Sequence, residues 1–387
     1  MKLLIFDWHA DGHHPIYMAR AAEALLPRCR VAAAGAEVVL EGVSGLDVDL
    51  YSLGDARPEP VDRAEERDLS ATEYSLLVRM LRASGADCVL HLYSDPVMPY
   101  LAQAPLDVRT VATVFYPCWH YPWTYGTSLP PRAAVKAWLL ERAVRKWRSR
   151  NEALGIFALD DMAVRRWNRS SGAPAFWFPE PPVAQLDGVS TDARSGCVLY
   201  GALAARKGVD RLAAALARDS SGLHAVIAGS VDESYADELN GYVHVMRTGG
   251  ARVDVRSWAH DERSGLELLA RAQCAVLPYH RHVGMSRVLL EAAAVGTPVL
   301  VHDHGLIAAL VQRHGIGLVV DCSDPRAFRR ALRSLSEEGT ENLYRAALRS
   351  FAERYDRERF AAALRRPFDL GPGERKADGA RLSTQLA

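Results

Sequence analysis

Residues 197–216 read CVLYGALAARKGVDRLAAAL, and this stretch decides the fold of the second half of the chain. The four apolar residues 197–200 have the length and hydrophobicity of a strand that is buried on both faces. A loop with Gly201 and Gly208 follows, and apolar residues then recur at helical spacing over 209–216. A strand, a glycine-bearing loop and a helix in this order are typical of a doubly wound α/β domain.

The same alternation continues as far as residue 321. Because short apolar runs alternate strictly with helical periodicity, we predict a parallel sheet whose strands are joined by right-handed helical crossovers. The strands are expected at 197–200, 225–228, 253–256, 275–277, 298–301 and 318–321, and the helices at 209–216, 234–248, 262–272, 286–295 and 306–313.

The N-terminal half has the same character. An apolar run at 3–6 ends at Asp7, and a polar loop then leads to a helix that opens at Pro15, a favoured first helical position. Further strands are expected at 88–92, 110–115 and 155–159, and helices at 73–81 and 133–148.

Proline and glycine without periodicity mark a linker over 178–195. We therefore predict an α/β protein with two Rossmann-like doubly wound domains, over 1–185 and 193–345, that face a cleft. Ligands are expected at the carboxyl ends of the strands. The helices over 346–366 are candidates for packing back on the N-terminal domain, and the tail over 369–387 is expected to be flexible.

The composition of the 387 residues excludes several classes of protein. Lys plus Arg equals Asp plus Glu, with 47 of each, so the formal net charge is zero and nucleic acid is not expected as a partner. Neither a signal peptide nor an apolar run of the roughly 20 residues that span a membrane is recognised, so a cytoplasmic protein without a transmembrane segment is expected. The six cysteines have no metal-binding spacing and are expected to be buried thiols.

The loop after the first strand of the C-terminal domain holds two adjacent cations, Arg206 and Lys207, directly before Gly208. They precede a helix, whose first N–H groups have no partners within the helix. Fixed positive charge beside a helix N-terminus suits a diphosphate. On the residues alone, the alternative is a solvated Arg–Lys pair in a loop.

A second candidate site spans 278–298, PYHRHVGMSRVLLEAAAVGTP. Gly284 permits a tight turn and a close approach of the backbone to a ligand, and Ser286 is a suitable helix N-cap. The amides from Met285 onward would then point out of the helix N-terminus. Glu291 lies within that helix in an apolar stretch, where a carboxylate needs partners. The hydroxyls of a ribose would serve, and so would an arginine across the cleft.

Two further candidate regions lie in the N-terminal half. The loop 11–15 (DGHHP) follows the first strand and should lie at its carboxyl end. The alternative is a loop in which the two histidines have no role. The loop 116–123 (YPCWHYPW) is dense in aromatic side chains, on which sugars and heterocycles stack. It is a candidate acceptor platform, and interdomain packing is the alternative.

Together these motifs resemble the GT-B-fold glycosyltransferases of family 4 (group 1), a large retaining family. The resemblance extends from Met1 to about Tyr355 and is strongest over 197–321. The His-Val-Gly-Met-Ser donor loop at 282–286 is similar to that of a bacterial subgroup linked to polysaccharide or glycoside assembly. The resemblance implies transfer of a sugar from a nucleotide-sugar, bound by the C-terminal domain, with retention of the anomeric configuration.

The resemblance also implies residue roles. Lys207 would bind the donor diphosphate, and Arg206 would supply the charge of an arginine that the family places where Ala202 stands. Base recognition in this fold usually uses backbone groups near the region that matches 257–258. The implied donor-binding residues are Gly12, Arg206, Lys207, Ser257, Trp258, His282, Gly284, Met285, Ser286 and Glu291.

This sequence departs from the family pattern at two positions. The family's Glu-x7-Glu motif ends at Glu291, the expected ribose ligand, but its first Glu falls on Val283, so His282 becomes the polar candidate for the sugar. Many members place a histidine where Phe115 stands, and His120 is the obvious substitute. The catalytic candidates are Arg206, Lys207, His120 and His13.

The physical requirements for such a transfer are modest. Cations and helix N-terminal amides can stabilise the leaving nucleoside diphosphate, and the candidate donor site has no Asp-x-Asp motif, so neither a metal nor a cofactor is expected. The proton of the acceptor hydroxyl or amine is expected to leave late, to the departing phosphate. The predicted partners are the nucleotide-sugar and an acceptor that is a small molecule, such as a natural product, or a glycan. A homodimer is also considered.

Two other functions remain open on the residues. The GT-B fold also hosts nucleotide-sugar epimerases, and the change at Val283 would fit one. An inactive nucleotide-sugar-binding subunit would keep Lys207 and Glu291 while Val283 and Phe115 replace two catalytic-site residues. Incubation of the donor without an acceptor separates these functions, since only an epimerase forms a new nucleotide-sugar.

Overall fold

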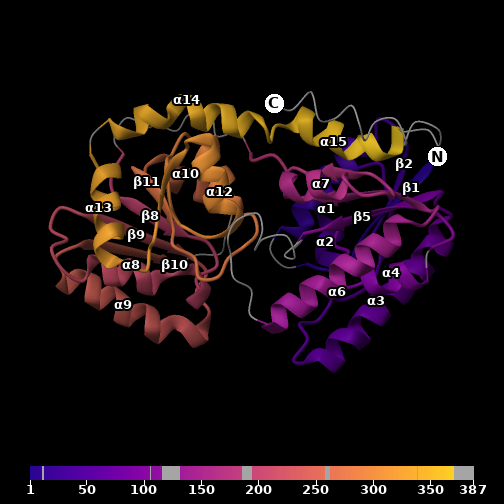
Figure 1. Cartoon of the computed structure of the whole chain (residues 1–387), viewed down its shortest axis with the longest axis horizontal. Helices are drawn as coiled ribbons and strands as arrows, with labels where there is room; N and C mark the ends of the chain where they lie inside the picture. Colours follow the sequence, from indigo (N-terminus) through magenta and orange to yellow (C-terminus); the bar gives the residue numbers. More distant parts are fainter. Residues whose placement is uncertain are drawn as a thin grey trace. The chain divides into compact units, whose positions relative to one another are not determined.

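The computed structural model describes residues 1–10, 13–104, 106–115, 131–184, 194–257, 262–337 and 339–369. The chain divides into two compact units, which we describe one at a time (Figure 1). The first unit combines the N-terminal part of the chain, as far as Pro181, with the segment that begins at Arg357. The second unit is formed mainly by Pro182–Asp356.

The first unit is built on a parallel sheet of seven strands in the order β3-β2-β1-β4-β5-β6-β7. The strand order reverses between β1 and β4, so the sheet is doubly wound. The strands are β1 (Lys2–Asp7), β2 (Arg30–Gly35), β3 (Asp49–Ser52), β4 (Cys88–His91), β5 (Arg109–Val114), β6 (Ala153–Ala158) and β7 (Ala175–Trp177).

Helices cover both faces of this sheet. Alternate residues of β1 point to opposite faces, so Leu4 and Phe6 enter one apolar core while Leu3 and Ile5 enter the other. The first core contains α3 (Arg63–Ser84), α4 (Met98–Gln103), α6 (Pro131–Arg148) and α7 (Asp161–Trp167). The second contains α1 (His14–Leu25), α2 (Glu37–Glu41) and α15 (Arg357–Asp369).

The helix α15 returns the chain to the first unit. Phe360 is buried, and its ring centroid lies 5.6 Å from that of Phe178. The Arg365 guanidinium donates a hydrogen bond to the carbonyl of Ala24 at the end of α1. In Figure 1 this yellow helix lies among the indigo and magenta elements that come from the first half of the sequence.

The second unit is built on a parallel sheet of six strands in the order β10-β9-β8-β11-β12-β13. This order matches that of the first six strands of the other sheet, with the reversal between β8 and β11. The prediction of two Rossmann-like sheets is confirmed. The strands are β8 (Cys197–Tyr200), β9 (His224–Gly229), β10 (Arg252–Ser257), β11 (Cys274–Leu277), β12 (Val299–His302) and β13 (Gly317–Val320).

The helices of the second unit also lie on both faces of their sheet. One core contains α8 (Val209–Leu216), α9 (Ala236–Thr248) and α13 (Pro325–Leu335), and the short 3₁₀ segments η2 (Ala205–Lys207) and η3 (Glu233–Tyr235) precede α8 and α9. The remaining helices pack with one another: α10 (Glu262–Ala270), α11 (Arg287–Ala294), α12 (Gly305–His314) and α14 (Thr340–Glu353).

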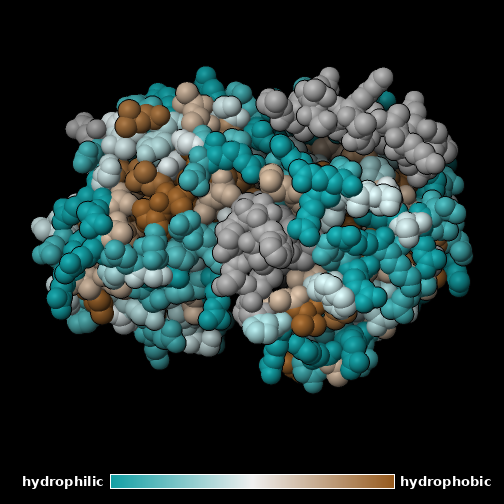
Figure 2. Space-filling view, viewed as in Figure 1, coloured by the Kyte–Doolittle hydropathy of each residue, from teal (hydrophilic) through white to brown (hydrophobic). Residues whose placement is uncertain are grey.

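The surface is mostly hydrophilic on the face drawn in Figure 2, with hydrophobic side chains in small groups. In the N-terminal half of α6, the side chains of Val135, Trp138 and Leu139 are each more than half exposed. Within the described ranges, no helix has the length and apolar character needed to cross a membrane.

Candidate functional site

The candidate site of the second unit lies where the strand order of its sheet reverses. Strands β8 and β11 are parallel neighbours, with Ala275 opposite Val198. The segments that follow them, 201–208 and 278–286, therefore leave the same edge of the sheet. Crevices at the carboxyl ends of strands on either side of such a reversal are the usual ligand sites of doubly wound folds.

Lys207 is the central cation of this edge. Its side chain is buried, and its Nζ donates a hydrogen bond of 3.2 Å to the hydroxyl of Tyr279 and lies 4.6 Å from the centroid of that ring. Gly201 leaves room for the ammonium, because a β carbon there would lie 3.0 Å from Nζ. Among the described residues, no carboxylate forms an ion pair with Lys207. A buried ammonium without a counterion favours the binding of an anion.

One end of the segment 278–286 is fixed to residues 206–211, which follow β8. The Arg211 guanidinium donates to the carbonyls of Pro278 and Tyr279, at 3.0 Å and 2.9 Å. The backbone N–H of His280 donates to the carbonyl of Arg206, and the His280 ring lies 2.7 Å from a carboxylate oxygen of Asp210. These bonds hold Tyr279 over Lys207.

The other end of the segment is fixed to the start of α12. The N–H of Leu306 donates to the carbonyl of Val283, and Gly305 adopts a φ of 72°, at which a β carbon would lie 2.8 Å from the carbonyl oxygen of His282. The N-termini of α11 and α12 therefore flank the segment, and both can contribute N–H groups to an anion.

Two details of this segment were not indicated by the sequence. The left-handed backbone needed for its turns occurs at Arg281 (φ 50°) and Gly305, and Gly284 is not among the residues with positive φ. Ser286 occupies the N-cap position of α11, but its hydroxyl makes no capping hydrogen bond and lies 3.5 Å from the hydroxyl of Tyr279. The side chain is thus directed to the ring that holds Lys207.

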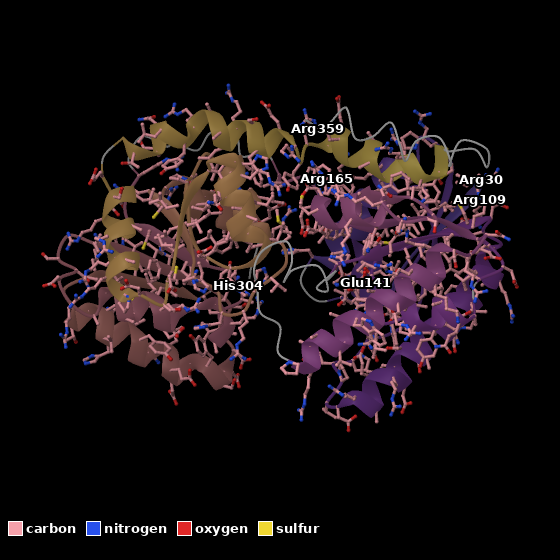
Figure 3. All side chains as sticks on the ribbon, in the orientation of Figure 1. Arg30, Arg109, Glu141, Arg165, His304 and Arg359 are labelled. Carbon is pink, nitrogen blue, oxygen red and sulfur yellow. The ribbon has the colours of Figure 1, made fainter. Side chains whose placement is uncertain are left out.

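Three histidine rings lie near the cations of this edge, Lys207, Arg206 and Arg211. In each histidine the neutral form is favoured. Burial lowers the pKa of His282 to about 4, with Lys207 and Arg206 acting in the same direction against a hydrogen bond to the carbonyl of Met285. Burial, and then Arg211, also lowers the pKa of His302 and of His304, which is labelled in Figure 3. At neutral pH these rings are therefore polar but uncharged. Arg206 itself is exposed.

Glu291 is buried at the same edge and is held by its own unit. The Tyr200 hydroxyl donates a short hydrogen bond to one carboxylate oxygen, and the Arg287 guanidinium lies 3.5 Å from the other. Arg287 also pairs with Glu262. Burial, and then the Glu291 carboxylate, raises the pKa of Tyr200 above its ordinary range, which keeps its hydroxyl protonated. The arginine partner of Glu291 thus comes from its own helix, and the ribose role stays a prediction.

The remaining candidate site residues lie in other parts of the fold or outside the residues that the structure describes. His13 occupies the N-cap position of α1 in the first unit, where its carbonyl accepts a hydrogen bond from Tyr17. Ser257 is the last residue of β10. Gly12, His120 and Trp258 lie outside the described residues. The second unit gathers the other candidates at one edge of its sheet: Arg206, Lys207, His282, Gly284, Met285, Ser286 and Glu291.

A comparison with protein families matches the part of the chain that contains this candidate site. Residues 194–338 match the family described as Glycosyl transferases group 1. The matched range contains both segments of the site and Glu291. The second unit is thus similar to the group 1 glycosyltransferases over most of its length. A comparison with curated proteins gave no match.

Solved structures of other proteins share the fold of the whole chain. Sucrose-phosphate synthase of Thermosynechococcus elongatus superimposes with a TM-score of 0.70 at 17% identity, over 95% of this chain and 98% of that one. HepE of Anabaena, solved with UDP and glucose, gives 0.67 at 13% identity, over 96% and 100%. WaaG, a glycosyltransferase of lipopolysaccharide biosynthesis, gives 0.63 at 17%, over 96% and 100%. At these identities the likeness establishes the GT-B fold alone.

Sequence reasoning missed three residues of the candidate site. Tyr279 lay within the quoted motif, but its contact with Lys207 joins residues 72 positions apart. Tyr200 ends a strand and was assigned only to the core, although a tyrosine at a carboxyl strand end is a signal for a side chain directed into a site. Arg211 follows one turn after the cation pair, and only the fold brings it to Pro278.

The low pKa of His282 predicts a pH effect on the stability of the glycosyltransferase. Its pKa in the folded chain, about 4, lies below the value of about 6.5 of a free histidine, so the unfolded chain binds more protons between these pH values. The contribution of the neutral His282 ring to the free energy of unfolding is therefore complete above about pH 6.5. It decreases as the pH falls toward 4, by roughly 3 kcal/mol. We expect denaturant unfolding of His282→Gln to show a smaller loss of stability between pH 7.5 and 5 than the wild type. Equal losses of stability in His282→Gln and the wild type would contradict a low pKa of His282 in the folded chain.

Proposed function

We propose that the protein transfers a sugar from a nucleotide-sugar donor to a small-molecule or glycan acceptor, with retention of the anomeric configuration and without a metal ion. The observation that carries this proposal is the buried ammonium of Lys207, which lies at the carboxyl edge of the sheet without a carboxylate partner among the described residues. A diphosphate is the ligand whose charge such a site would complement.

The cations would act mainly on the leaving group. When the bond between the sugar and the diphosphate breaks, negative charge develops on the phosphate oxygen. Lys207 from the inside and Arg206 from the surface would stabilise that charge, together with the N–H groups at the starts of α11 and α12. These groups are fixed before the reaction by the bonds that hold the segment 278–286, so little reorganisation is required.

The sugar and the ribose would be bound by different groups. Because its pKa is low, the His282 ring is neutral and can serve as a hydrogen-bonding group for the sugar where Val283 offers none. Glu291 is held by Tyr200 and Arg287, an arrangement that would direct the carboxylate to the ribose hydroxyls. A uridine nucleotide is the first donor to test, since HepE of Anabaena was solved with UDP-glucose.

A panel of nucleoside diphosphates and their sugars, screened by the thermal shift that bound ligand produces, tests the donor class. A donor that stabilises the protein is then incubated with candidate acceptors, and the product is characterised by NMR. An inverted anomeric centre would reject retention. Formation of a new nucleotide-sugar without acceptor would favour an epimerase, and binding without turnover of any donor would favour a binding subunit.

The ribose role of Glu291 predicts a change in nucleotide affinity. We expect Glu291→Gln to weaken the binding of UDP, or of the nucleoside diphosphate selected by the panel, by about tenfold, because a charge-assisted hydrogen bond is replaced by a neutral one. Calorimetry measures this directly. Tyr200→Phe is the matched variant, since it removes the hydroxyl that orients the carboxylate but keeps the charge. Equal affinities for Glu291→Gln and the wild type would reject the role.

A further inference from the structure

The helix α6 of the first unit has two faces that meet different surroundings. Ala137, Val144 and Trp147 recur at helical spacing on one face, where they are buried and belong to an apolar core of the sheet. The opposite face is exposed. It also carries large apolar side chains, which the packing of the first unit does not require.

Val135, Trp138 and Leu139 form an apolar group on the exposed face of α6. Their exposed fractions are 58%, 51% and 54%. Side chains three and four positions apart lie next to one another on a helix, so these three are neighbours. Single apolar residues are common on protein surfaces, but a contiguous group of them marks a contact with another molecule or with a membrane.

Cations continue the same face toward the C-terminal end of α6. Arg142 and Lys146 follow Leu139 at intervals of three and four residues, and both are exposed. The Arg142 guanidinium lies 4.8 Å from the centroid of the Trp138 ring, so a charge and an aromatic ring are in contact within this face. We call Val135, Trp138, Leu139, Arg142 and Lys146 the α6 stripe.

No carboxylate of α6 offsets the charge of the stripe. Glu141 is the acidic residue of this helix, and its side chain has an exposed fraction of 13%. It pairs with Arg145 at 2.6 Å and with Arg166 of α7 at 3.7 Å. Among the residues that the structure describes, no carboxylate forms an ion pair with Arg142 or Lys146. The α6 stripe is therefore both apolar and positively charged.

This combination fits the surface of a membrane that contains anionic lipids. A helix with tryptophan and aliphatic side chains beside cations can lie in the plane of the interface, with its apolar side chains below the headgroups and its cations on the lipid phosphates. Tryptophan is favoured at this depth because its ring is apolar and its N–H is polar. The stripe belongs to one helix and extends over about 16 Å, which suits a planar surface rather than a shaped groove.

We propose that the α6 stripe docks the first unit on anionic membrane surfaces. Val135, Trp138 and Leu139 enter the boundary between the headgroups and the acyl chains, and Arg142 and Lys146 bind lipid phosphates. The docking is peripheral, because the opposite face of α6 stays in the core of its own unit. It involves no residue of the donor site, so it does not depend on the proposed function.

The test is sedimentation of the full chain with two kinds of vesicle. One kind consists of phosphatidylcholine alone, and the other of equal parts of phosphatidylcholine and phosphatidylglycerol. We expect the wild type to partition onto the anionic vesicles at least about tenfold more strongly, because each cation near an anionic surface adds to the attraction. Salt at about 1 M should weaken this binding, since it shortens the Debye length to about 3 Å.

A charge-reversal variant tests the cations of the stripe. Arg142→Glu combined with Lys146→Glu should lower partitioning onto the anionic vesicles by about tenfold or more. Arg326→Glu combined with Arg330→Glu is the matched control, since it reverses two exposed cations with the same spacing on α13 of the second unit. The control should partition as the wild type does.

A second variant tests the apolar group. Trp138→Ser should lower partitioning by about tenfold, because it removes the largest apolar side chain of the stripe. Leu343→Ser should not change it, although Leu343 of α14 is 80% exposed. All these positions are exposed, so the melting temperatures of the variants should stay close to that of the wild type, which thermal unfolding checks.

Several results would overturn the proposal. The wild type would have to bind neither kind of vesicle, or bind both equally, which would leave no part for charge. Wild-type partitioning of a folded Trp138→Ser variant would also reject the stripe as the docking surface. If the wild type ignored vesicles but formed a dimer that Trp138→Ser dissociates in analytical ultracentrifugation, the stripe would belong to an interface with a second copy of the chain.

Discussion

We expect Lys207→Ala to lower the rate of sugar transfer at saturating donor by about 100-fold or more, the usual effect of removing a fixed donor from developing negative charge. The ammonium is buried, it is held by the hydroxyl and ring of Tyr279, and Gly201 keeps the space beside it open. A rigid charge in a buried site acts more strongly on a leaving diphosphate than a mobile surface charge does. Steady-state kinetics with a saturating nucleotide-sugar measure this effect.

Two variants separate the charge of Lys207 from its packing. Lys207→Met keeps most of the side-chain volume and removes the charge, so its rate should be as low as that of Lys207→Ala. Lys136→Ala removes an exposed cation of α6 in the first unit and should leave the rate unchanged. A wild-type rate for Lys207→Met at saturating donor would show that the ammonium does not act on the leaving group.

Most of the sheet could be predicted from the sequence because its central strands are buried on both faces. Such strands are short continuous apolar runs, as β8 and β11 are, and their alternation with helices indicates a parallel sheet. The strands that the sequence did not indicate have a different composition. β2 reads RVAAAG, and alanine has little preference for strands, while most of β3 is exposed. Pairing with β1 along its whole length is what makes β2 a strand.

The start of α3 was missed for a related reason. Its first turns are polar, so apolar periodicity indicated only 73–81, whereas the helix begins at Arg63. The signal for this start was Asp62, whose side chain accepts hydrogen bonds from the N–H groups of Ala64 and Glu65. A capping residue defines the end of a helix even where its exposed face has no apolar pattern.

The candidate site could be predicted only where its residues are close in the sequence. The adjacent cations Arg206 and Lys207 and the helix after Ser286 are local patterns. The contact between Tyr200 and Glu291 joins residues 91 positions apart, and no periodicity indicates it. Long-range partners of this kind decide whether a carboxylate is available to a ligand, so the sequence could name Glu291 but not its surroundings.

The two sheets share one strand order, and each places a buried charge at its reversal. In the second unit that charge is the ammonium of Lys207, and in the first it is the carboxylate of Asp7. A cation at this place suits a leaving diphosphate. Both charges occupy the same position in their sheets because the carboxyl edge at a reversal is where a doubly wound sheet exposes its loops.

The largest structural effect is expected for Gly208→Ala. Gly208 joins η2 to α8 with a φ of 74°, and a β carbon there would lie 2.2 Å from the carbonyl oxygen of Pro278. Since that oxygen belongs to the backbone, the segments 201–208 and 278–286 would have to separate. We expect a loss of about 3 kcal/mol in the free energy of unfolding, which corresponds to roughly 6–12 °C in the melting temperature of a unit of this size. Nucleotide affinity should fall as well, because Lys207 and Tyr279 lie on opposite sides of this contact.

Gly222→Ala separates the two causes of this loss. Gly222 has a similar φ of 81° in the same unit, but a β carbon there would meet no atom within 4 Å. The Gly222→Ala variant therefore loses only the free energy of unfolding that left-handed backbone costs an alanine, about 1 kcal/mol. Its nucleotide affinity should be unchanged. Thermal unfolding and calorimetry of both variants measure the difference. If Gly208→Ala were no less stable than Gly222→Ala and bound the nucleotide equally well, the close contact with Pro278 would not be what holds the two segments together. Donor binding would then have to depend on the Arg211 and His280 bonds alone.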